Sequence, residues 1–369
     1  MTLNWIDILF ISSFLIQSTI WGLLFRLPTR SKLRQQKNTQ RVPVTIVVCA
    51  HNECDNLKKL IPELLNRNYP DFEIIIVNDR STDDTLDLLA TYSQGKIKTI
   101  TIKNTPENFN HKKHALQQGI EAAKHDYILV TDADCMPHSS FWISEMISSL
   151  PTKKGIVLGM SPYFPLSSSP ILNQIIQFET AITALNMSSF TLAGFPYMGL
   201  GRNMLYHKSI FLNSPITTTF KHTTGGDDDL LVNYMGTESN TSICFSPESL
   251  VFSYPKKTIK SWFHQKRRHL QASSFYSIKS KILLSIINVS HGFFIFSLII
   301  QQYLTLPTYF IIVAYLLRTY LLFVIFDRIC RKLKSRTNLM FIIIGDFVYP
   351  FYLFTLGILS IVFKTNTWK

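Results

Sequence analysis

The chain is poor in cysteine, with five among 369 residues, at positions 49, 54, 135, 244 and 330. None of them stands in a Cys-x-x-Cys spacing, so the sequence supports neither a disulfide framework nor a zinc site. The chain also has no internal repeat and no long low-complexity segment. Its length instead allows a globular domain of roughly 200–250 residues together with additional segments.

The N-terminus lacks the basic start and the clear small-residue cleavage site of a signal peptide, although residues 5–25 are mostly apolar. We therefore expect a retained membrane anchor there. Three further apolar runs cover residues 282–303, 306–326 and 339–363. Each run has about 20 residues or more, which is long enough to cross a hydrocarbon core of about 30 Å.

Acidic residues are fewer than basic ones, 24 against 37, and the formal net charge is +13. Two clusters of cations flank the apolar runs, and the positive-inside rule places both in the cytoplasm. Residues 26–281 are then expected in the cytoplasm and both chain termini outside. Nucleic acid is the alternative partner, but charges beside apolar runs favour anionic membrane lipids, so we expect no nucleic-acid partner. The clusters are Arg26, Arg30, Lys32, Arg34, Lys37 and Arg41, and Arg328, Arg331, Lys332, Lys334 and Arg336.

Strand-like and helix-like segments alternate in the N-terminal half of the soluble part. Apolar, mostly Val/Ile-rich runs predict strands near 44–50, 72–77, 96–103 and 126–134. Helical spacing predicts helices at 54–67, from about 81–83 onward and at 112–124, the first capped by Asp55 or Asn56. This alternation predicts an α/β domain with a mostly parallel central sheet and helices on both faces.

Polar side chains gather where three of these strands end. The apolar strand Tyr-Ile-Leu-Val runs directly into Asp132 and Asp134, one residue apart. Acids at strand ends commonly cap helices or turns, which is the simpler interpretation of any one of them. Parallel sheets, however, bind ligands at the carboxyl ends of their strands, so three such ends together favour a ligand site. The other polar ends are Ala50, His51, Asn52 and Glu53, and Asn78, Asp79 and Arg80.

Six short motifs follow one another in the chain: CAHNE, VNDRSTDDT, HKKHAL, TDADC, GGDDDL and QKRRH. In this order they resemble the motifs of membrane-bound family 2 glycosyltransferases of the GT-A fold, over roughly residues 42–270. The resemblance implies transfer of a sugar from a nucleotide diphosphate, usually UDP, with inversion at the anomeric carbon. The expected order is an anchor at 1–25, a basic linker at 26–41, a GT-A domain at 42–254, a basic interfacial segment at 255–281 and three transmembrane helices at 282–363.

The acid pair is the expected metal site. Two carboxylates at a strand end suit Mg²⁺ or Mn²⁺, which binds substrate phosphates and offsets the charge that builds on a pyrophosphate leaving group. The resemblance implies that Asp134 is the more direct metal ligand and that Asp132 lies nearer the ribose and the metal-bound waters. A solvated pair of turn acids is the alternative.

The resemblance also implies a nucleotide site on the preceding motifs. Asp79 would accept hydrogen bonds from uracil or ribose, and the loop with Ala50, His51 and Glu53 would contact the nucleotide. Lys112 would lie near the pyrophosphate, although His111 stands where the family has glycine. His51 as a loop residue without ligand contacts and Lys112 as a surface charge remain the simpler alternatives.

The cluster Gly-Gly-Asp-Asp-Asp-Leu supplies the expected general base. Aligning Asp229 and Leu230 with the family's Asp-Leu places Asp227 in the position of the base that takes the acceptor's proton. Gly226 stands where an acid is common. Three adjacent acids repel one another, so one is expected to have a raised pKa. Asp228 and Asp229 also suit an acidic helix N-terminus.

Two further segments are expected on the acceptor side. Gln265 and Arg268 match the family's Q-x-x-R-W and would face the acceptor and the pyrophosphate. His269, however, replaces the Trp that stacks on acceptor sugars in polymerising members, which puts processivity in doubt. Residues 256–281 contain eight Lys/Arg and no acid, typical of an interfacial amphipathic helix. The loop with Gly201, Arg202 and Asn203 would approach the acceptor, with a plain turn before a strand as the alternative.

The sequence therefore favours an inner-membrane glycosyltransferase that extends a lipid-linked or polysaccharide acceptor with a nucleotide-sugar donor and a divalent metal. Transfer to a polyprenyl phosphate, which needs no base, and a transport or scaffolding subunit with an inactive domain are the alternatives. Within the apolar runs, Arg318 and Asp346 are expected at similar depth, near Asn288 and His291. They predict either an ion pair that locks two helices or a polar layer beside an acceptor or product path.

Overall fold

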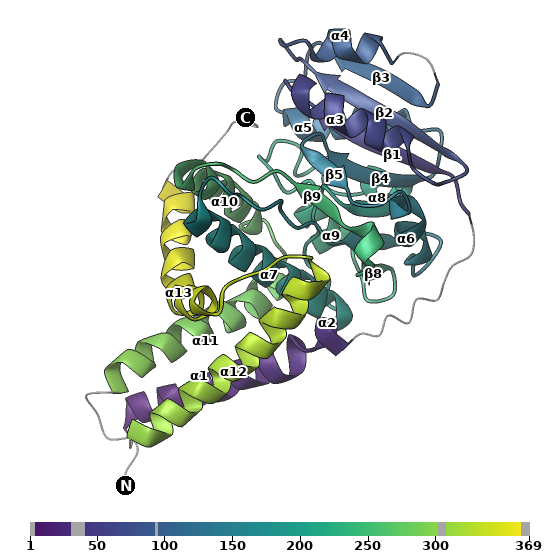
Figure 1. The fold of residues 1–369 in the computed structure, drawn as a ribbon. Coiled ribbons are helices and arrows are strands. Elements are labelled where there is room, and N and C mark those ends of the chain that lie inside the picture. The colour runs from purple at the N-terminus through teal and green to yellow at the C-terminus, as the bar shows by residue number, and fades with distance from the viewer. Residues whose placement is uncertain (1–3, 31–40, 93–94, 302–307, 363–369) are drawn as a thin grey trace.

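The computed structural model describes residues 4–30, 41–92, 95–301 and 308–362. An α/β body lies at one end, and long helices extend away from it toward the N-terminal end of the chain (Figure 1). The body contains a seven-stranded sheet in the order β3-β2-β1-β4-β7-β6-β8. Its strands are β1 (Val44–Ala50), β2 (Phe72–Asp79), β3 (Ile97–Ile102), β4 (Tyr127–Asp132), β6 (Ile156–Gly159), β7 (Met204–His207) and β8 (Thr241–Cys244).

The sheet is mostly parallel, as predicted. Strands β3, β2, β1 and β4 pair in parallel, and so do β6 and β8, whereas β7 runs antiparallel to both of its neighbours. The register pairs Ala50 with Asn78 and Cys49 with Asp132, so the polar strand ends meet at one edge. Two short strands, β5 (Cys135–Pro137) and β9 (Val251–Ser253), form a second, antiparallel sheet.

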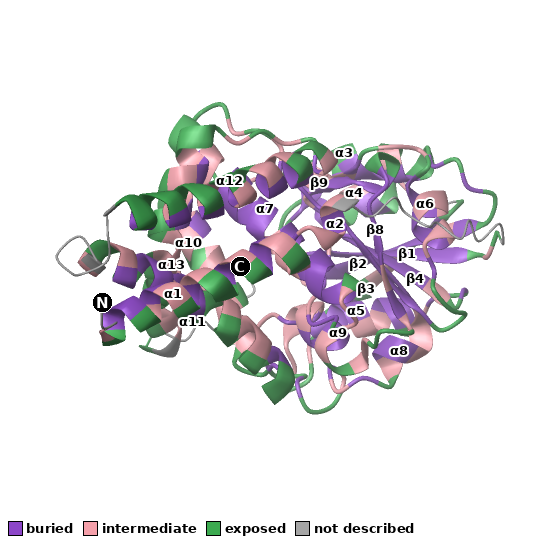
Figure 2. Cartoon of the chain, turned by 90° about the horizontal axis from the view of Figure 1, so that it is seen from below, coloured by how far each residue is buried: buried purple, intermediate pink, exposed green. Residues whose placement is uncertain are grey.

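Helices cover both faces of the sheet because the residues of β1 alternate between them. Val47 packs on the side of α5 (His111–Glu121), whereas Val48 packs on the side of α3 (Cys54–Leu65). A Cβ on Gly119 of α5 would come within 2.7 Å of Val47, so only glycine permits this close packing. The buried strands appear purple in Figure 2. Shorter helices of the body are α4 (Thr85–Ala90), α6 (Trp142–Ser148), α8 (Lys208–Leu212), α9 (Asp229–Met235) and the single turn η2 (Pro247–Ser249).

Helix α3 begins at the predicted residue 54, but its N-cap residue differs from the prediction. Glu53, rather than Asp55 or Asn56, is its N-cap residue. The neighbouring loop supplies the missing acceptors, because Asp83 accepts a hydrogen bond from the Cys54 N–H and Thr85 accepts one from the Glu53 N–H. Tertiary contacts thus satisfy the first amide groups of this helix, and a local capping residue is not needed.

Two helices join the body to the long helices. α7 (Pro170–Leu192) was not predicted from the sequence, although its central residues are buried. α10 (Ile259–Ser273) occupies the predicted basic interfacial segment, but the helix ends at Ser273 and the next one starts at Ile278 rather than at 282.

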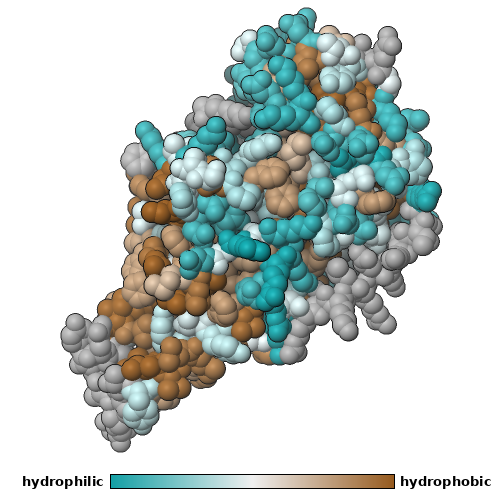
Figure 3. Space-filling view, in the orientation of Figure 1, coloured by the Kyte–Doolittle hydropathy of each residue, from teal (hydrophilic) through white to brown (hydrophobic). Residues whose placement is uncertain are grey.

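Four helices are long and apolar enough to cross a membrane, one N-terminal and three C-terminal, as predicted. Their apolar side chains form the brown end of the surface in Figure 3. α12 extends beyond the predicted end at 326, so that Arg331 and Lys332 lie in its last turn, where cations complement the helix dipole. The predicted ends at 303, 306 and 363 lie outside the described residues. The elements are α1 (Trp5–Thr19), η1 (Ile20–Leu24), α2 (Leu27–Arg30), α11 (Ile278–Gln301), α12 (Thr308–Lys332) and α13 (Leu339–Val362).

The predicted contact between Arg318 and Asp346 is present. Nη2 of Arg318 donates to Oδ1 of Asp346 at 3.0 Å and to Oε1 of Gln17 at 3.0 Å. Nε2 of His291 lies 3.1 Å from the same Asp346 oxygen, and Gln17 donates to Ser290 at 2.8 Å. All five side chains belong to buried residues, so one polar cluster connects the four long helices.

Candidate active site

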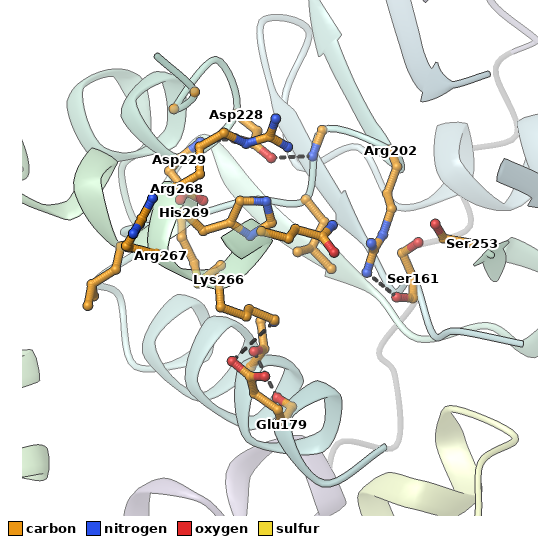
Figure 4. Close-up of a pocket in the computed structure, with 18 of the residues that line it drawn as sticks. Ser161, Glu179, Arg202, Asp228, Asp229, Ser253, Lys266, Arg267, Arg268 and His269 are labelled. Atoms are coloured by element: carbon orange, nitrogen blue, oxygen red, sulfur yellow. Dashed lines mark hydrogen bonds and ion pairs between the residues drawn. The ribbon is translucent and has the colours of Figure 1, made fainter. Parts of the chain in front are cut away.

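A cavity of about 880 Å³ opens at the carboxyl edge of β1 and β4 and continues along α7 and α10 to α11 and α13. Figure 4 shows part of its wall, with side chains from α7, the loop before β7 and α10. Most of the predicted site residues line it: His51, Glu53, Lys112, Asp132, Asp134, Gly201, Arg202, Asp227, Gln265 and Arg268. Ala50, Asp79 and Asn203 are not among the lining residues.

The acid pair stands at the exit of β4, as the sequence indicated. Asp132 is the last residue of the strand, and ligand atoms of Asp132, Asp134 and Cys135 lie within 4.8 Å of one another. Burial, and then the charge of the neighbouring Asp132, raise the pKa of Asp134. Burial also keeps the pKa of the Cys135 thiol well above its usual range, so the thiol stays neutral. Two carboxylates beside a neutral thiol suit a hard divalent cation rather than zinc.

Lys112, at the start of α5, joins the acid pair to the acid cluster. Its ammonium group lies 3.2 Å from Asp132 and 3.2 Å from Asp227. Burial alone would lower the pKa of Lys112, but these two carboxylates outweigh it and raise the pKa well above its usual range. The side chain is therefore a fixed cation inside the cavity and not a surface charge.

The three adjacent acids have different surroundings. Asp228 caps α9, because it accepts hydrogen bonds from the N–H groups of Asp229 and Gly201. Asp229 accepts a hydrogen bond from the hydroxyl of Tyr276 at 2.9 Å. Asp227, in contrast, is ion-paired with Lys112. The first two acids thus have structural partners, and Asp227 is the acid of the three that pairs with a cation of the cavity.

The predicted rise of a pKa occurs in this cluster, but not at Asp227. Desolvation and the charge of the preceding acid raise the pKa of Asp228 and keep that of Asp229 well above its usual range. Burial would also raise the pKa of Asp227, but Lys112 and Lys113 outweigh it, so the net shift is downward. Asp227 is consequently ionised at neutral pH and can accept a proton only when its pairing with Lys112 loosens.

The loop before β7 approaches protein atoms more closely than expected. A Cβ on Gly201 would lie 3.1 Å from Oδ2 of Asp228, so a larger residue would fit only if that carboxylate shifted slightly. Arg202 donates to the Tyr163 hydroxyl at 2.7 Å and to the Ser161 carbonyl at 2.8 Å. Asn203 is fully buried and binds Met160 and other core groups, which separates it from the cavity. Of this loop, Gly201 and Arg202 line the cavity.

The nucleotide-side residues lie at neighbouring strand ends. Nδ1 of His51 lies 2.6 Å from the carbonyl oxygen of Asp79, which fixes the loop after β1 against the end of β2. The Asp79 carboxylate is buried and accepts two hydrogen bonds from Arg80, at 2.8 and 3.0 Å. His51 and Glu53 line the cavity with the acid pair, and Asp79 contacts His51 from outside the lining.

The comparisons with known proteins agree with this geometry. Residues 45–212 match the family described as Glycosyl transferase family 2. The chain carries a family 2 glycosyltransferase domain. A mannosyltransferase from Pyrobaculum calidifontis, solved in complex with GDP-Man and Mn²⁺, has a TM-score of 0.54 and 15% identity over 92% of this chain and 98% of its own. This likeness confirms the predicted GT-A fold.

Two relatives carry the name poly-beta-1,6-N-acetyl-D-glucosamine synthase. The one from Staphylococcus epidermidis is 27% identical over 247 residues, covering 66% of this chain and 57% of its own. The one from Staphylococcus aureus (strain MSSA476) is 32% identical over 155 residues, covering 41% of this chain and 36% of its own. The chain thus spans little more than half of the first relative's length and about a third of the second's.

The cavity wall contains a buried ion pair that the sequence motifs did not indicate. Glu179 of α7 lies 3.2 Å from Lys266 of α10, and both residues line the cavity. Burial raises the pKa of Glu179 despite that cation. A single glutamate within a long apolar stretch was the available signal, but helical spacing alone does not show which helix faces it.

Helix α10 brings the variant Q-x-x-R-H motif to the same cavity. Gln265, Arg268 and His269 all line it, and the side-chain oxygen of Gln265 is buried without a hydrogen-bond partner in the described part of the chain. Enclosure in the cavity wall, together with the charges of Lys266 and Arg268, keeps the pKa of His269 well below its usual range. His269 is therefore neutral where the family's motif has an aromatic ring.

Proposed function

We propose that the chain is an inverting glycosyltransferase that moves a sugar from a nucleotide diphosphate sugar to a glycan at the cytoplasmic face of a bacterial-type inner membrane. The observation that carries the proposal is the meeting of Asp132, Asp134, Lys112 and Asp227 in one cavity. Cation-binding acids, a fixed ammonium and a carboxylate base are the groups that displacement of a pyrophosphate requires.

In this reaction Asp227 takes the proton of an acceptor hydroxyl. The hydroxyl oxygen forms the new bond to the anomeric carbon as the bond to the pyrophosphate breaks, and the nucleoside diphosphate leaves with the bonding electrons. Lys112 faces both the base and the acid pair, so it can exchange its contact with Asp227 for one with the leaving group. That exchange would free the base when a donor is bound.

The acids Asp132 and Asp134 would hold a divalent cation, Mg²⁺ or Mn²⁺, which supplies positive charge to the pyrophosphate when bound. The donor side would consist of His51 and Glu53, with Asp79 behind them. UDP is the proposed nucleotide, on the strength of the motif resemblance. Gln265, Arg268 and the loop of Gly201 and Arg202 would face the acceptor.

A polysaccharide acceptor is supported by the two relatives named as synthases of a poly-N-acetylglucosamine. The decisive experiment measures nucleotide release by purified protein over a panel of UDP- and GDP-sugars, with and without glycan acceptors. We expect one UDP-sugar to give acceptor-stimulated release, and Asp134→Ala to abolish it. Absence of release from every donor, although nucleotide still binds, would indicate an inactive scaffolding domain.

Transfer to a lipid phosphate is the second candidate. The cavity continues between cations of α10 and the apolar side chains Leu284, Leu353 and Leu356 of α11 and α13, a combination that fits an anionic lipid head with its chain. A phosphate acceptor is already anionic and needs no base. Retention of glycolipid synthesis in Asp227→Asn would favour this candidate, whereas its loss favours a hydroxyl acceptor.

A further inference from the structure

Helix α13 is long and apolar enough to cross a membrane, but its two halves have different neighbours. In the first half, Asp346 reaches Arg318 and His291 in the middle of α12 and α11. About 21 Å of helix separates Asp346 from Ser360. If α13 crossed the membrane beside α11 and α12, Ser360 would therefore lie at the far end of the helix bundle, which is the end away from the α/β body.

The second half of α13 instead lies beside the α/β body. Nε2 of Gln271 in α10 donates to the Ser360 carbonyl at 3.4 Å. The rings of Tyr352 and Phe263 in α10 are 6.2 Å apart, and Leu356 lines the same cavity as Lys112. α10 precedes α11 and belongs to the body's side of the bundle, so the end of α13 lies on that side. Figure 1 shows α13, in yellow, turning beside α10 and away from the far ends of α1 and α12.

The far end of the bundle is formed by the other three long helices. A buried apolar cluster there joins Phe10 of α1, Phe294 and Ile295 of α11, and Ile311 and Ala314 of α12. No residue of α13 belongs to this cluster within the described ranges. The outer half of the bundle is thus closed without the fourth helix.

Two residues of α13 explain its direction. Pro350 lies inside the helix, where its ring removes a backbone hydrogen bond and permits a bend. Gly345 packs directly on α7, since a Cβ at this position would lie 2.9 Å from the ring of Phe178. The packing of Gly345 fixes the first half of the helix against the body, and a bend at Pro350 would direct the second half along α10.

The outward face of α13 is a continuous apolar stripe. It is formed by Met340, Ile344, Phe347, Phe351, Phe354, Ile358 and Val362, and Phe354 is 71% exposed. Helices α11 and α12, which the first half of α13 reaches through Asp346, also carry exposed apolar side chains. A surface of this kind needs an apolar cover, and the acyl chains around α11 and α12 are continuous with it.

We infer that α13 enters the membrane only as far as Asp346 and returns along α10, with its apolar stripe in the acyl chains and its end on the side of the α/β body. Within the described residues the chain then crosses the membrane three times, and Asn4 and Val362 lie on opposite sides. This replaces the charge-based expectation that both termini lie outside. The second half of α13 becomes the membrane-facing wall of the cavity, through Tyr349, Leu353 and Leu356.

Cysteine pairs test the position of Ser360 in native membranes. The pair Gln271→Cys with Ser360→Cys should crosslink with a short bifunctional reagent, whereas Leu298→Cys with Ser360→Cys should not. All five native cysteines are buried, so each single variant serves as the background control. Failure of the first pair, or crosslinking of the second, would overturn the inference.

The side on which the chain ends is tested independently of enzymatic activity. Epitope tags on the two termini are probed in right-side-out and inside-out vesicles, and Glu107→Cys, an exposed position of the α/β body, is labelled with an impermeant maleimide. The C-terminal tag should be accessible on the same side as Glu107→Cys, and the N-terminal tag on the other. Two tags accessible on one side would restore the four-span arrangement.

Discussion

The ammonium group of Lys112 lies 3.2 Å from the carboxylate of Asp227, and the same group lies 3.2 Å from Asp132. One side chain of α5 therefore connects the proposed base with the proposed metal site. The pair keeps Asp227 ionised, since its pKa is lowered although burial alone would raise it. A base that is ionised but paired is available for catalysis only after its cation moves.

Asp227→Asn should lower turnover by about 10²-fold or more, the scale of a lost general base, while the affinity for UDP changes only a few-fold. Kinetics and nucleotide binding on the purified protein test this. Asp228→Asn is the matched control, because Asp228 caps α9 and holds the Gly201 N–H. Asp228→Asn should lower the melting temperature and leave most of the turnover. The reverse pattern would move the base to Asp228.

Two variants should distinguish the binding of the metal from the binding of the nucleotide. Asp134→Ala should abolish metal-dependent UDP binding, because a single carboxylate holds a hard divalent cation weakly. Asp79→Ala should weaken UDP binding without removing its metal dependence, because Asp79 lies beside the cavity wall and outside the acid pair. Titration calorimetry with and without Mn²⁺ distinguishes the two. Unchanged turnover in EDTA would contradict the metal role.

The ion pair of Arg318 and Asp346 should contribute strongly to the assembly of the long helices. Asp346→Ala leaves a buried guanidinium without its carboxylate, which costs about 3–5 kcal/mol. Ser290→Ala removes the hydrogen bond from Gln17 and the one that Ser290 donates to the Ile287 carbonyl, which should cost about 1 kcal/mol each. Thermal unfolding in detergent compares the two. The double change Arg318→Met with Asp346→Leu should recover part of the loss, and equal costs for both single variants would argue against the lock.

Stability should depend on pH through Lys113. Its buried ammonium group donates to the Phe220 carbonyl, and burial lowers its pKa to about 8. Between pH 8 and the unfolded pKa of about 10.4 the unfolded chain binds more protons, so this group makes the fold more stable as pH rises. Between pH 7.5 and 9.5 the melting temperature of the wild type should therefore rise relative to that of Lys113→Met. The absence of any shift over this range would show that Lys113 stays charged in the folded protein.

The sequence by itself determined the α/β scheme, the acid pair at the exit of β4 and the four long apolar helices, because each depends on local periodicity and on the end of a strand. Because Arg318 and Asp346 lie at similar depth within their apolar runs, the sequence even predicted that the two side chains meet. Only the tertiary structure decided how the three adjacent acids differ, since their pKa shifts depend on Lys112 and Tyr276, which are distant in sequence. It also decided that Glu179 faces Lys266 and that Asn203 lies outside the cavity. The direction of α13 was likewise decided only by the tertiary structure. Composition fixes that the helix is apolar, but its packing on Phe178 and Gln271 decides on which side of the bundle it ends, because an apolar helix can be covered by lipid along its length or by a protein face.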